Sequence, residues 1–275
     1  PATVRNVTQL KADGKVVIEP ASGFLAEGYN GKGRLPEPEE IFEQITFLES
    51  RRTSKSPLKG KSVLITAGGT KERIDPVRYI SNDSSGKMGY ALAKAASILG
   101  AKVQLVSTTK QLKVPFGVEV TYVESAREME EVVTSHFPTT DVAVMVAAVS
   151  DYYVANCSEQ KIKKQHNELG LKLDLVENPD ILKELAHSKK QDQVVIGFAA
   201  ETEKVLEYAK IKLEKKETDA IIANDVSSSQ IGFNADKHEV TILTKSGKQI
   251  RLPVCSKDEL AIGIWKSLLD IKVIQ

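Results

Sequence analysis

Residues 61–70 read Lys-Ser-Val-Leu-Ile-Thr-Ala-Gly-Gly-Thr, and residues 84–89 read Ser-Ser-Gly-Lys-Met-Gly. The first run predicts a short buried strand that ends in a tight turn at its two glycines, where a side chain would clash. The second run predicts the start of a helix, with Ser84 or Ser85 as its N-cap. Free backbone N–H groups at such turns and helix starts bind anions without a charged side chain. The sequence therefore predicts two phosphate-binding turns in tandem.

Strand-like and helix-like patterns alternate along the chain after this point. Strands are predicted at 63–67, 102–107, 141–149, 194–197 and 220–223, and helices from 86 onward, at 126–137 and at 203–216. This alternation is typical of an α/β fold with a doubly wound, mostly parallel, Rossmann-like sheet. A small β-hairpin extension at 239–244 and 249–254 and a last helix at 257–269 follow. Ligands of such folds bind beyond the carboxyl ends of the strands.

The first part of the chain has a different character. Glycine and proline interrupt residues 1–50, where only 39–49 has a helical pattern, and 51–60 is a polar run typical of a linker. We therefore predict an N-terminal appendage at 1–60 and a main domain at 61–275.

Charge and composition exclude several classes of function. The 38 Lys and Arg residues nearly balance the 37 Asp and Glu residues, so no global field attracts nucleic acid or an anionic membrane. With only 2 cysteines, neither a disulfide framework nor a cysteine metal site is indicated, and a reduced cytoplasm fits best. The four histidines show no metal-like spacing. We expect a cytoplasmic protein that binds neither nucleic acid nor membrane.

Lysines gather at two places in the predicted main domain. Lys161, Lys163 and Lys164 lie in an irregular stretch that we expect to be a mobile loop, although such runs are often only a solvated surface. Lys212 and Lys216 lie one turn apart on one face of a predicted helix. With two phosphate-binding turns nearby, these cations favour a triphosphate over a monophosphate.

A nicotinamide enzyme is an alternative interpretation. Tyr208 and Lys212 have the Tyr-x-x-x-Lys spacing of short-chain dehydrogenases, but the Gly-x-Gly-x-x-Gly fingerprint is absent. A tyrosine at that helical position is more often a packed side chain than a catalytic acid. Asp151 follows the apolar run 141–149, and we expect it at the rim of the site because it ends a strand.

Several motifs together resemble one family, the phosphopantothenate-cysteine ligases. They are 66–70 (Thr-Ala-Gly-Gly-Thr), 75–82 (Asp-Pro-Val-Arg-Tyr-Ile-Ser-Asn), 84–89, 147–151 (Ala-Ala-Val-Ser-Asp), 161–164 (Lys-Ile-Lys-Lys), 178–182 (Asn-Pro-Asp-Ile-Leu), 197–202 (Gly-Phe-Ala-Ala-Glu-Thr) and 223–226 (Ala-Asn-Asp-Val). The resemblance runs from about residue 60 to the end of the chain. It is to the synthetase half of the bacterial bifunctional coenzyme A biosynthesis flavoproteins.

Residues 5–42 resemble the tail of the decarboxylase half of those flavoproteins. The flavin-binding core lies outside this chain, so the resemblance implies FMN only for that missing half. Many decarboxylases have a catalytic cysteine before a glycine in this tail, whereas this sequence has Glu27 before Gly28. This segment therefore lacks the cysteine that those decarboxylases use as a proton donor.

The resemblance implies a ligase reaction in two steps. The carboxylate of 4'-phosphopantothenate attacks the α-phosphate of CTP to give an acyl-cytidylate and pyrophosphate, and the amine of L-cysteine then displaces CMP to form the amide. Because two anions meet in the first step, cations and Mg²⁺ on the phosphates are needed. The metal ligands are not evident from the sequence.

The resemblance also implies site residues. Lys161 and Asn82 would be catalytic. The nucleotide would be bound by Gly68, Ser84, Gly86, Gly89, Met145, Val146, Ala147, Asp151, Lys161, Pro179, Asp180, Ile181, Leu182, Phe198, Lys212, Lys216 and Asn224. Phosphopantothenate would be bound by Arg78, Asn82, Ala147, Ala148 and Asp151.

In this family the residue at Arg78 reaches the neighbouring protomer's site, so a homodimer is implied, with the decarboxylase half as a further part of the full-length protein. Two other classes of function stay open at this point. One is the nicotinamide oxidoreductase described above, and the other is a non-catalytic module that holds the decarboxylase together as a dimer.

Overall fold

The structure is a computed structural model that describes residues 1–53, 55–163, 170–201, 203–225 and 237–274. It divides into two compact units, Pro1–Ser54 and Lys55–Gln275. The larger unit therefore begins a few residues before the boundary predicted at 60. Leu58 explains the difference, because its side chain is fully buried in the core of that unit and its N–H bonds to the carbonyl of Leu99 at 2.9 Å.

The smaller unit is built from short elements, namely α1 (Ala2–Ala12), β1 (Ala21–Phe24), β2 (Asn30–Arg34) and α2 (Pro38–Arg52). The strands pair as an antiparallel hairpin, and α2 contains the helix predicted at 39–49. Phe24, Leu35 and Phe42 are exposed.

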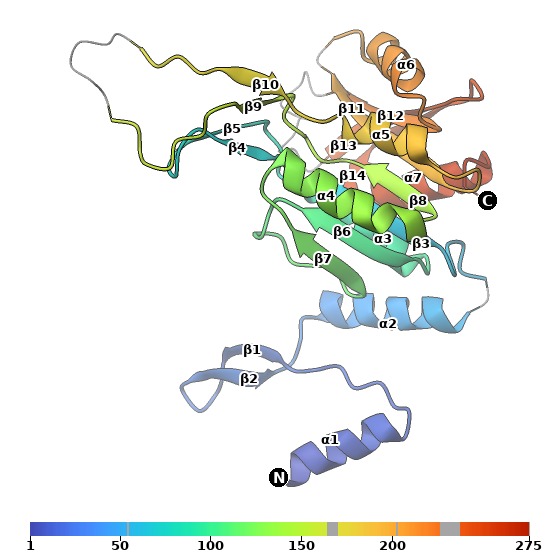
Figure 1. The fold of residues 1–275 in the computed structure, drawn as a ribbon. Helices are drawn as coiled ribbons and strands as arrows, with labels where there is room; N and C mark the ends of the chain where they lie inside the picture. Colours follow the sequence, from blue (N-terminus) through green and yellow to red (C-terminus); the bar gives the residue numbers. More distant parts are fainter. Residues whose placement is uncertain (54, 164–169, 202, 226–236, 275) are drawn as a thin grey trace. The chain divides into compact units, whose positions relative to one another are not determined.

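A sheet of 8 strands forms the centre of the larger unit (Figure 1). Its order is β14-β13-β12-β11-β8-β3-β6-β7. The strands are β3 (Ser62–Ala67), β6 (Lys102–Ser107), β7 (Val118–Tyr122), β8 (Val142–Met145), β11 (Val194–Glu201), β12 (Ala220–Asp225), β13 (Lys237–Thr244) and β14 (Gln249–Ser256). The strands from β12 to β7 run parallel, which confirms the predicted α/β fold. The predicted hairpin is β13 and β14, which continue the sheet as antiparallel strands.

The order of the parallel strands reverses direction between β3 and β8. From β3 the chain moves outward to β6 and β7, and it then returns to β8 and continues to β11 and β12 on the other side. Such a reversal opens a crevice at the carboxyl ends of the two central strands, where doubly wound proteins bind their ligands. The topology therefore predicts the site beyond β3 and β8.

Helices cover both faces of the sheet (Figure 1). They are α3 (Lys87–Ile98) and α7 (Lys257–Asp270) on one face, and α4 (Ala126–His136), α5 (Ile181–Ser188) and α6 (Val205–Lys216) on the other. A single 3₁₀ turn, Phe137–Thr139, follows α4. Adjacent residues of β3 serve opposite faces, since Val63 and Ile65 pack with α3 and α7 whereas Leu64 packs with α4 and α5.

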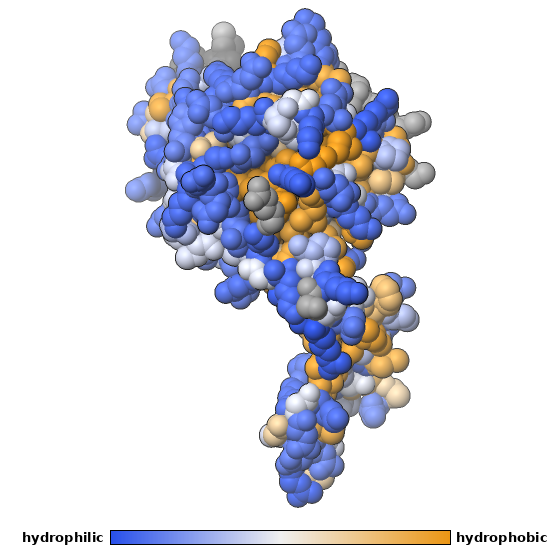
Figure 2. All heavy atoms as spheres, turned by 90° about the vertical axis from the view of Figure 1, so that its right-hand side faces the viewer, coloured by the Kyte–Doolittle hydropathy of each residue, from blue (hydrophilic) through white to orange (hydrophobic). Residues whose placement is uncertain are grey.

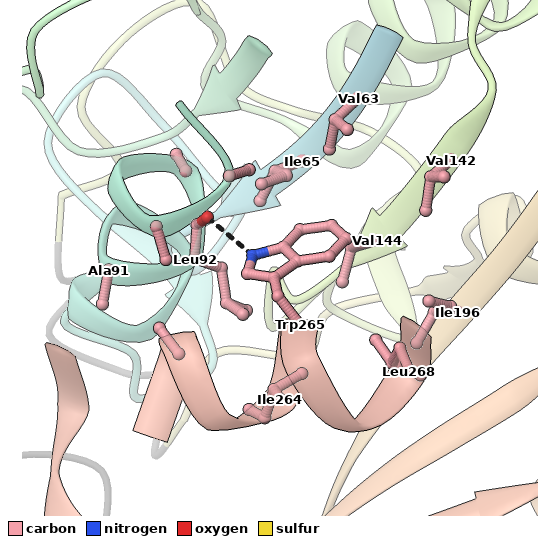
Figure 3. Close-up of a cluster of buried hydrophobic side chains, with 14 of the residues drawn as sticks. Val63, Ile65, Ala91, Leu92, Val142, Val144, Ile196, Ile264, Trp265 and Leu268 are labelled. Atoms are coloured by element: carbon pink, nitrogen blue, oxygen red, sulfur yellow. Dashed lines mark hydrogen bonds between the residues drawn. The ribbon is translucent and has the colours of Figure 1, made fainter. Parts of the chain in front are cut away.

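Trp265 is the largest fully buried side chain of the described residues. It projects from α7 toward β3, β8 and α3, and its indole N–H donates to the carbonyl of Leu92 at 3.0 Å (Figure 3). Because the ring fills space among Ile65, Val144 and Leu268 while its polar atom is satisfied, it fixes α7 against α3 and the sheet.

Two small hairpins stand apart from the central sheet. Strands β4 (Lys71–Arg73) and β5 (Tyr79–Ser81) form one, and β9 (Tyr152–Val154) and β10 (Leu175–Glu177) form the other. Neither hairpin was predicted from the sequence. Several of their apolar side chains are exposed, among them Val77 in the turn, Tyr79 and Val176. On the face of the larger unit drawn in Figure 2, hydrophobic residues also gather in a band between hydrophilic ones.

Candidate active site

A cavity of about 950 Å³ lies at the carboxyl ends of β3, β8, β11 and β12, where the topology predicts a site. Its walls come from Gly68, 81–89, 145–152, 177–182, 198–200, Lys212, Lys216, Asn224 and Lys257. A volume of this size accommodates a nucleotide or another ligand of similar size.

Nearly all of the predicted site residues line this one cavity. They are Gly68, Asn82, Ser84, Gly86, Gly89, Met145, Val146, Ala147, Ala148, Asp151, Pro179, Asp180, Ile181, Leu182, Phe198, Lys212, Lys216 and Asn224. Arg78, Lys161 and Lys163 do not line it, and Lys164 lies outside the described residues.

The two glycine turns pack directly against each other. Gly68 has φ +90° and Gly86 has φ +75°, a backbone conformation that favours glycine. A Cβ built on Gly86 would lie 3.4 Å from the backbone nitrogen of Gly68 and 2.9 Å from Cγ2 of Thr109. The turns therefore form one continuous surface of backbone at the mouth of β3 and α3.

The predicted N-cap of α3 was wrong. Gly86, and not Ser84 or Ser85, occupies the N-cap position, in the left-handed conformation. A side-chain cap requires an extended backbone at the N-cap, which the left-handed Gly86 does not supply. The first N–H groups of α3 consequently begin at the cavity wall, where an anion can accept from them.

Strand β8 ends earlier than predicted. It stops at Met145 because the hydroxyl of Thr66 accepts from the N–H groups of Val146 and Ala147, at 3.0 and 3.1 Å, in place of a continuing strand ladder. Beyond a single bridge between Gly69 and Ala148, the chain runs free of the sheet. Asp151 therefore lies in a loop before β9 instead of at a strand end, although it does line the cavity.

Hydrogen bonds from two asparagines hold the loops around the cavity in place. Asn82 donates from Nδ2 to the carbonyl of Val149 at 3.1 Å. Asn178 donates from Nδ2 to the carbonyl of Ser150 at 2.9 Å and from its backbone N–H to the carbonyl of Asp151 at 2.8 Å. These bonds hold the loops before α3 and before α5 against the chain that follows β8.

Gly197 of β11 makes room for the loop before α5. A Cβ there would lie 2.6 Å from Cδ2 of Leu182 and 2.7 Å from Cδ1 of Ile221. Leu182 can therefore pack flat against the sheet and bring the segment from Pro179 to the cavity wall.

Two lysines of α6 point to the cavity, as their spacing predicted. The Nζ of Lys212 donates to the carbonyl of Phe198 at 2.8 Å, and burial lowers the pKa of this ammonium from its ordinary value. Lys216 forms an ion pair with Asp180, the residue that caps α5. Their positive charges are held within one wall of the site.

Several lining residues were missed by the sequence analysis, namely Asp83, Tyr152, Glu177 and Lys257. Lys257 is the first residue of α7, and it is only 8% exposed. No motif marks it, because an isolated lysine in the first turn of a helix is usually a surface residue. Only the fold brings it to the carboxyl ends of strands that precede it in the chain.

Arg78 and the segment that contains Lys161 meet beside the β4–β5 hairpin. The guanidinium of Arg78 pairs with Asp75, and its Nη2 donates to the carbonyl of Ile162 at 2.9 Å. Ile162 directly follows Lys161, and the same hairpin continues into Asn82 at the cavity. The two residues are thus connected to the site through backbone and hydrogen bonds.

The residues described contain no group of three or more His, Cys, Asp or Glu side chains arranged to hold a metal ion. In the part of the chain that the structure describes, no helix is both long and apolar enough to cross a membrane.

The fold and the position of the cavity define a doubly wound α/β protein with its ligand site at the switch point between β3 and β8. Residues 58–271 match the family described as DNA/pantothenate metabolism flavoprotein C-terminal domain. The chain belongs to this family.

Proteins of similar sequence agree with that assignment. The chain is 46% identical over 269 residues to the coenzyme A biosynthesis bifunctional protein CoaBC of Bacillus subtilis (strain 168), an alignment that covers 98% of this chain and 65% of that protein. The chain thus spans slightly less than two thirds of the length of this relative.

Solved structures share the fold. One is the crystal structure of the C-terminal domain of coenzyme A biosynthesis bifunctional protein CoaBC, with 41% identity, a TM-score of 0.67, and coverage of 79% of this chain and 98% of that one. Another is a Cab2 mutant in complex with phosphopantothenate-cysteine, with 19% identity, a TM-score of 0.60, and coverage of 86% and 95%. At that lower identity the likeness concerns the fold.

Proposed function

We propose that this chain is a phosphopantothenate-cysteine ligase of coenzyme A biosynthesis. The observation that carries the proposal is that the glycine turns, the lysines of α6 and the loop 179–182 line one cavity of about 950 Å³. The membership of the family and the identity to CoaBC support the same activity.

In the first step, a carboxylate oxygen of 4'-phosphopantothenate attacks the α-phosphorus of CTP, and the bond to the pyrophosphate oxygen breaks. The backbone N–H groups around Gly68 and Gly86 would hold phosphate oxygens, because both glycines line the cavity and Gly86 is the N-cap of α3. Lys212 and Lys216, together with the newly found Lys257, would offset the charge of the two anions.

In the second step, the cysteine amine attacks the acyl carbon, the bond to CMP breaks and the nitrogen loses a proton. Asn82 is suited to orient the acyl group, since an amide both donates and accepts hydrogen bonds without adding charge. Its bond to Val149 fixes the side chain at the cavity wall before a substrate arrives.

Mg²⁺ would enter with the nucleotide and neutralise its phosphates. The described residues offer no ready-made cluster of ligands, which suits a cation held chiefly by phosphate oxygens and water with one or two carboxylates. Asp83, Asp151 and Glu177 are cavity-lining carboxylates that would be available for that purpose.

We also propose that the protein works as a homodimer in which Arg78 serves the opposite protomer's site. The exposed apolar side chains of Val77, Tyr79 and Val176 on the two hairpins beside Arg78 support a protein contact in this region. A decarboxylase half with FMN would belong to the longer protein, and a cytoplasmic location is favoured by the two free cysteines.

The alternative functions receive less support. A short-chain dehydrogenase needs Tyr208 beside Lys212 in its site, whereas Lys212 lines the cavity and Tyr208 does not. A purely structural dimerisation module would not need lysines, one of them half-buried, at the switch point of the sheet.

The direct test is release of pyrophosphate from CTP in the presence of Mg²⁺ and 4'-phosphopantothenate, followed by formation of the amide and CMP when cysteine is added. We expect the highest kcat/KM with CTP and a lower value with ATP. Absence of pyrophosphate release from the folded protein with either nucleotide would overturn the ligase assignment, and equal kcat/KM values would overturn the preference for CTP.

A further inference from the structure

Asp75 in the turn between β4 and β5 is a fully buried carboxylate that no part of the proposed reaction uses. Its Oδ1 accepts from the backbone N–H groups of Val77 and Arg78, at 2.9 and 2.8 Å. Its Oδ2 accepts from Nε and Nη2 of Arg78 and, at 3.1 Å, from the backbone N–H of Ile162. Both carboxylate oxygens are therefore fully engaged.

The bond to Ile162 is one of several that join the same two segments. Nη2 of Arg78 donates to the carbonyl of Ile162 at 2.9 Å, so both backbone groups of this residue are held by the Asp75–Arg78 pair. The N–H of Ser158 donates to the carbonyl of Ile74 at 2.9 Å. The segment from 158 to 162 is thus fastened to the hairpin at both of its ends.

The charge of Asp75 is retained under ordinary conditions. The ion pair and hydrogen bonds from Arg78 hold the pKa of the carboxyl well below its usual range, even though burial acts in the opposite direction. A charged acceptor makes stronger hydrogen bonds than a neutral one. The attachment of Ile162 is accordingly firmer than a bond between two neutral loop groups.

We infer that Asp75 is a positioning residue that fixes the segment carrying Lys161 to the hairpin that leads into Asn82. Lys161 directly precedes Ile162, while the strand β5 after the Asp75 turn continues into Ser81 and Asn82 at the cavity. Movement of the hairpin and of the Lys161 backbone is therefore coupled. The attachment itself rests on the contacts above, whereas the catalytic role of Lys161 is the one that the family resemblance implies and rests on the proposed function.

The test uses the full chain with Asp75→Asn, and Glu124→Gln as a matched control. Glu124 also pairs with an arginine of this hairpin, Arg73, and among the described residues it forms no hydrogen bond or ion pair with 158–162. Hydrogen exchange at Ser158 and Ile162 should accelerate about tenfold or more in Asp75→Asn, with unchanged exchange in β3 and β8. The kcat for pyrophosphate release should fall about tenfold while the KM for CTP stays within about twofold. Glu124→Gln should show neither change.

Two further variants keep the test decisive, one if Asp75→Asn does not fold and one by asking whether Asp75 acts through Lys161. Ile162→Pro removes one N–H donor and leaves the bonds within the hairpin in place, so it should reproduce the fall in kcat if Asp75→Asn does not fold. In a Lys161→Gln background, Asp75→Asn should add nothing to the loss, because the carboxylate acts through Lys161.

Unchanged exchange at Ile162 in folded Asp75→Asn would overturn the attachment. Faster exchange with a normal kcat, or with a rise in KM that equals the loss in kcat/KM, would overturn the positioning role. If the wild-type chain releases no pyrophosphate, the proposed function fails, and the exchange measurement still decides whether Asp75 holds this segment.

Discussion

Lys216 of α6 and Asp180 at the start of α5 form an ion pair that joins two walls of the cavity. Asp180 also accepts from the N–H of Lys183 at 3.2 Å, so one carboxylate caps a helix and holds a lysine. A triphosphate that enters the cavity competes with Asp180 for this ammonium.

Lys216→Gln should therefore weaken nucleotide binding more than turnover. We expect the KM for CTP to rise about tenfold, since a charge-assisted contact to phosphate is lost, with a smaller change in kcat. Lys215→Gln removes an exposed lysine from the same turn and should leave both constants unchanged. Equal effects of the two substitutions in steady-state kinetics would show that only the general charge of α6 matters.

Asn82→Asp should slow the second half-reaction selectively. The new carboxylate cannot donate to the carbonyl of Val149, and it places negative charge where the acyl phosphate forms. The variant should accumulate acyl-cytidylate, measured by mass spectrometry after a quench, while pyrophosphate release continues. A proportional loss of both half-reactions would contradict a role in amide formation.

Gly86→Ala should disrupt the contact between the two glycine turns. Both the left-handed backbone, which costs about 1–2 kcal/mol for a residue with a side chain, and the clash with Thr109 oppose the substitution. We expect a loss of stability in chemical denaturation and a nucleotide Kd raised at least about tenfold.

Gly60→Ala separates these two causes. Gly60 has a similar φ of +84°, but nothing lies within 4 Å of its Cβ position. It should share the backbone cost and leave the Kd unchanged. A Kd for Gly86→Ala no worse than that for Gly60→Ala would mean that the turn does not contact the nucleotide.

The buried ammonium of Lys212 should make nucleotide binding dependent on pH. Because burial lowers its pKa from 10.5, Lys212 loses its proton at a lower pH than an exposed lysine, and affinity for CTP should fall as the pH rises through that lowered pKa. Binding of the anion should be accompanied by proton uptake on this alkaline side. Calorimetry in buffers of different ionisation enthalpy measures that uptake, and Lys212→Met should abolish it.

The same shift affects stability in the opposite direction. Between the lowered pKa and 10.5 the unfolded chain binds more protons than the folded one, so the contribution of Lys212 to the free energy of unfolding rises with pH in this window. The pH profile of stability for Lys212→Met should lack that rise. An identical profile in the variant and the wild type would contradict the burial argument.

Arg78 offers a test of the proposed dimer. Subunits that carry Arg78→Gln are expected to complement subunits that carry Asn82→Ala, because the mixed dimer contains one site with both native residues. Activity should recover on mixing to a fraction of the wild-type value, in a preparation in which subunit exchange is demonstrated. Without recovery, Arg78 would be assigned to the site of its own chain, through its contacts with Asp75 and Ile162.

The buried strands were the most predictable part of the fold. Apolar runs such as 102–107 end in clear turns, and the structure has β6 at those residues. The predicted run 141–149 was too long, since the hydroxyl of Thr66, distant in sequence, ends β8 at Met145. Strand ends depend on such partners, which a local pattern does not contain.

In the candidate site too, residues in local sequence patterns were predicted, whereas contacts between distant parts of the chain were not. Glycine turns and the pair Lys212 and Lys216 are local patterns, and all of them line the cavity. The attachment of residues 158–162 to the hairpin around Asp75 was not predicted, because Ile162, which donates to Asp75, is far along the chain. Lys257 was missed for the same reason.

The walls of the cavity come from both ends of the larger unit, from Gly68 after its first strand to Lys257 at the start of its last helix. During synthesis, the turns at Gly68 and Gly86 leave the ribosome long before α7 exists. A growing chain therefore cannot present the complete pocket until α7 has been made and has docked through Trp265. Substrate binding can therefore stabilise only complete chains against unfolding. A chain truncated before α7 would lack that stabilisation.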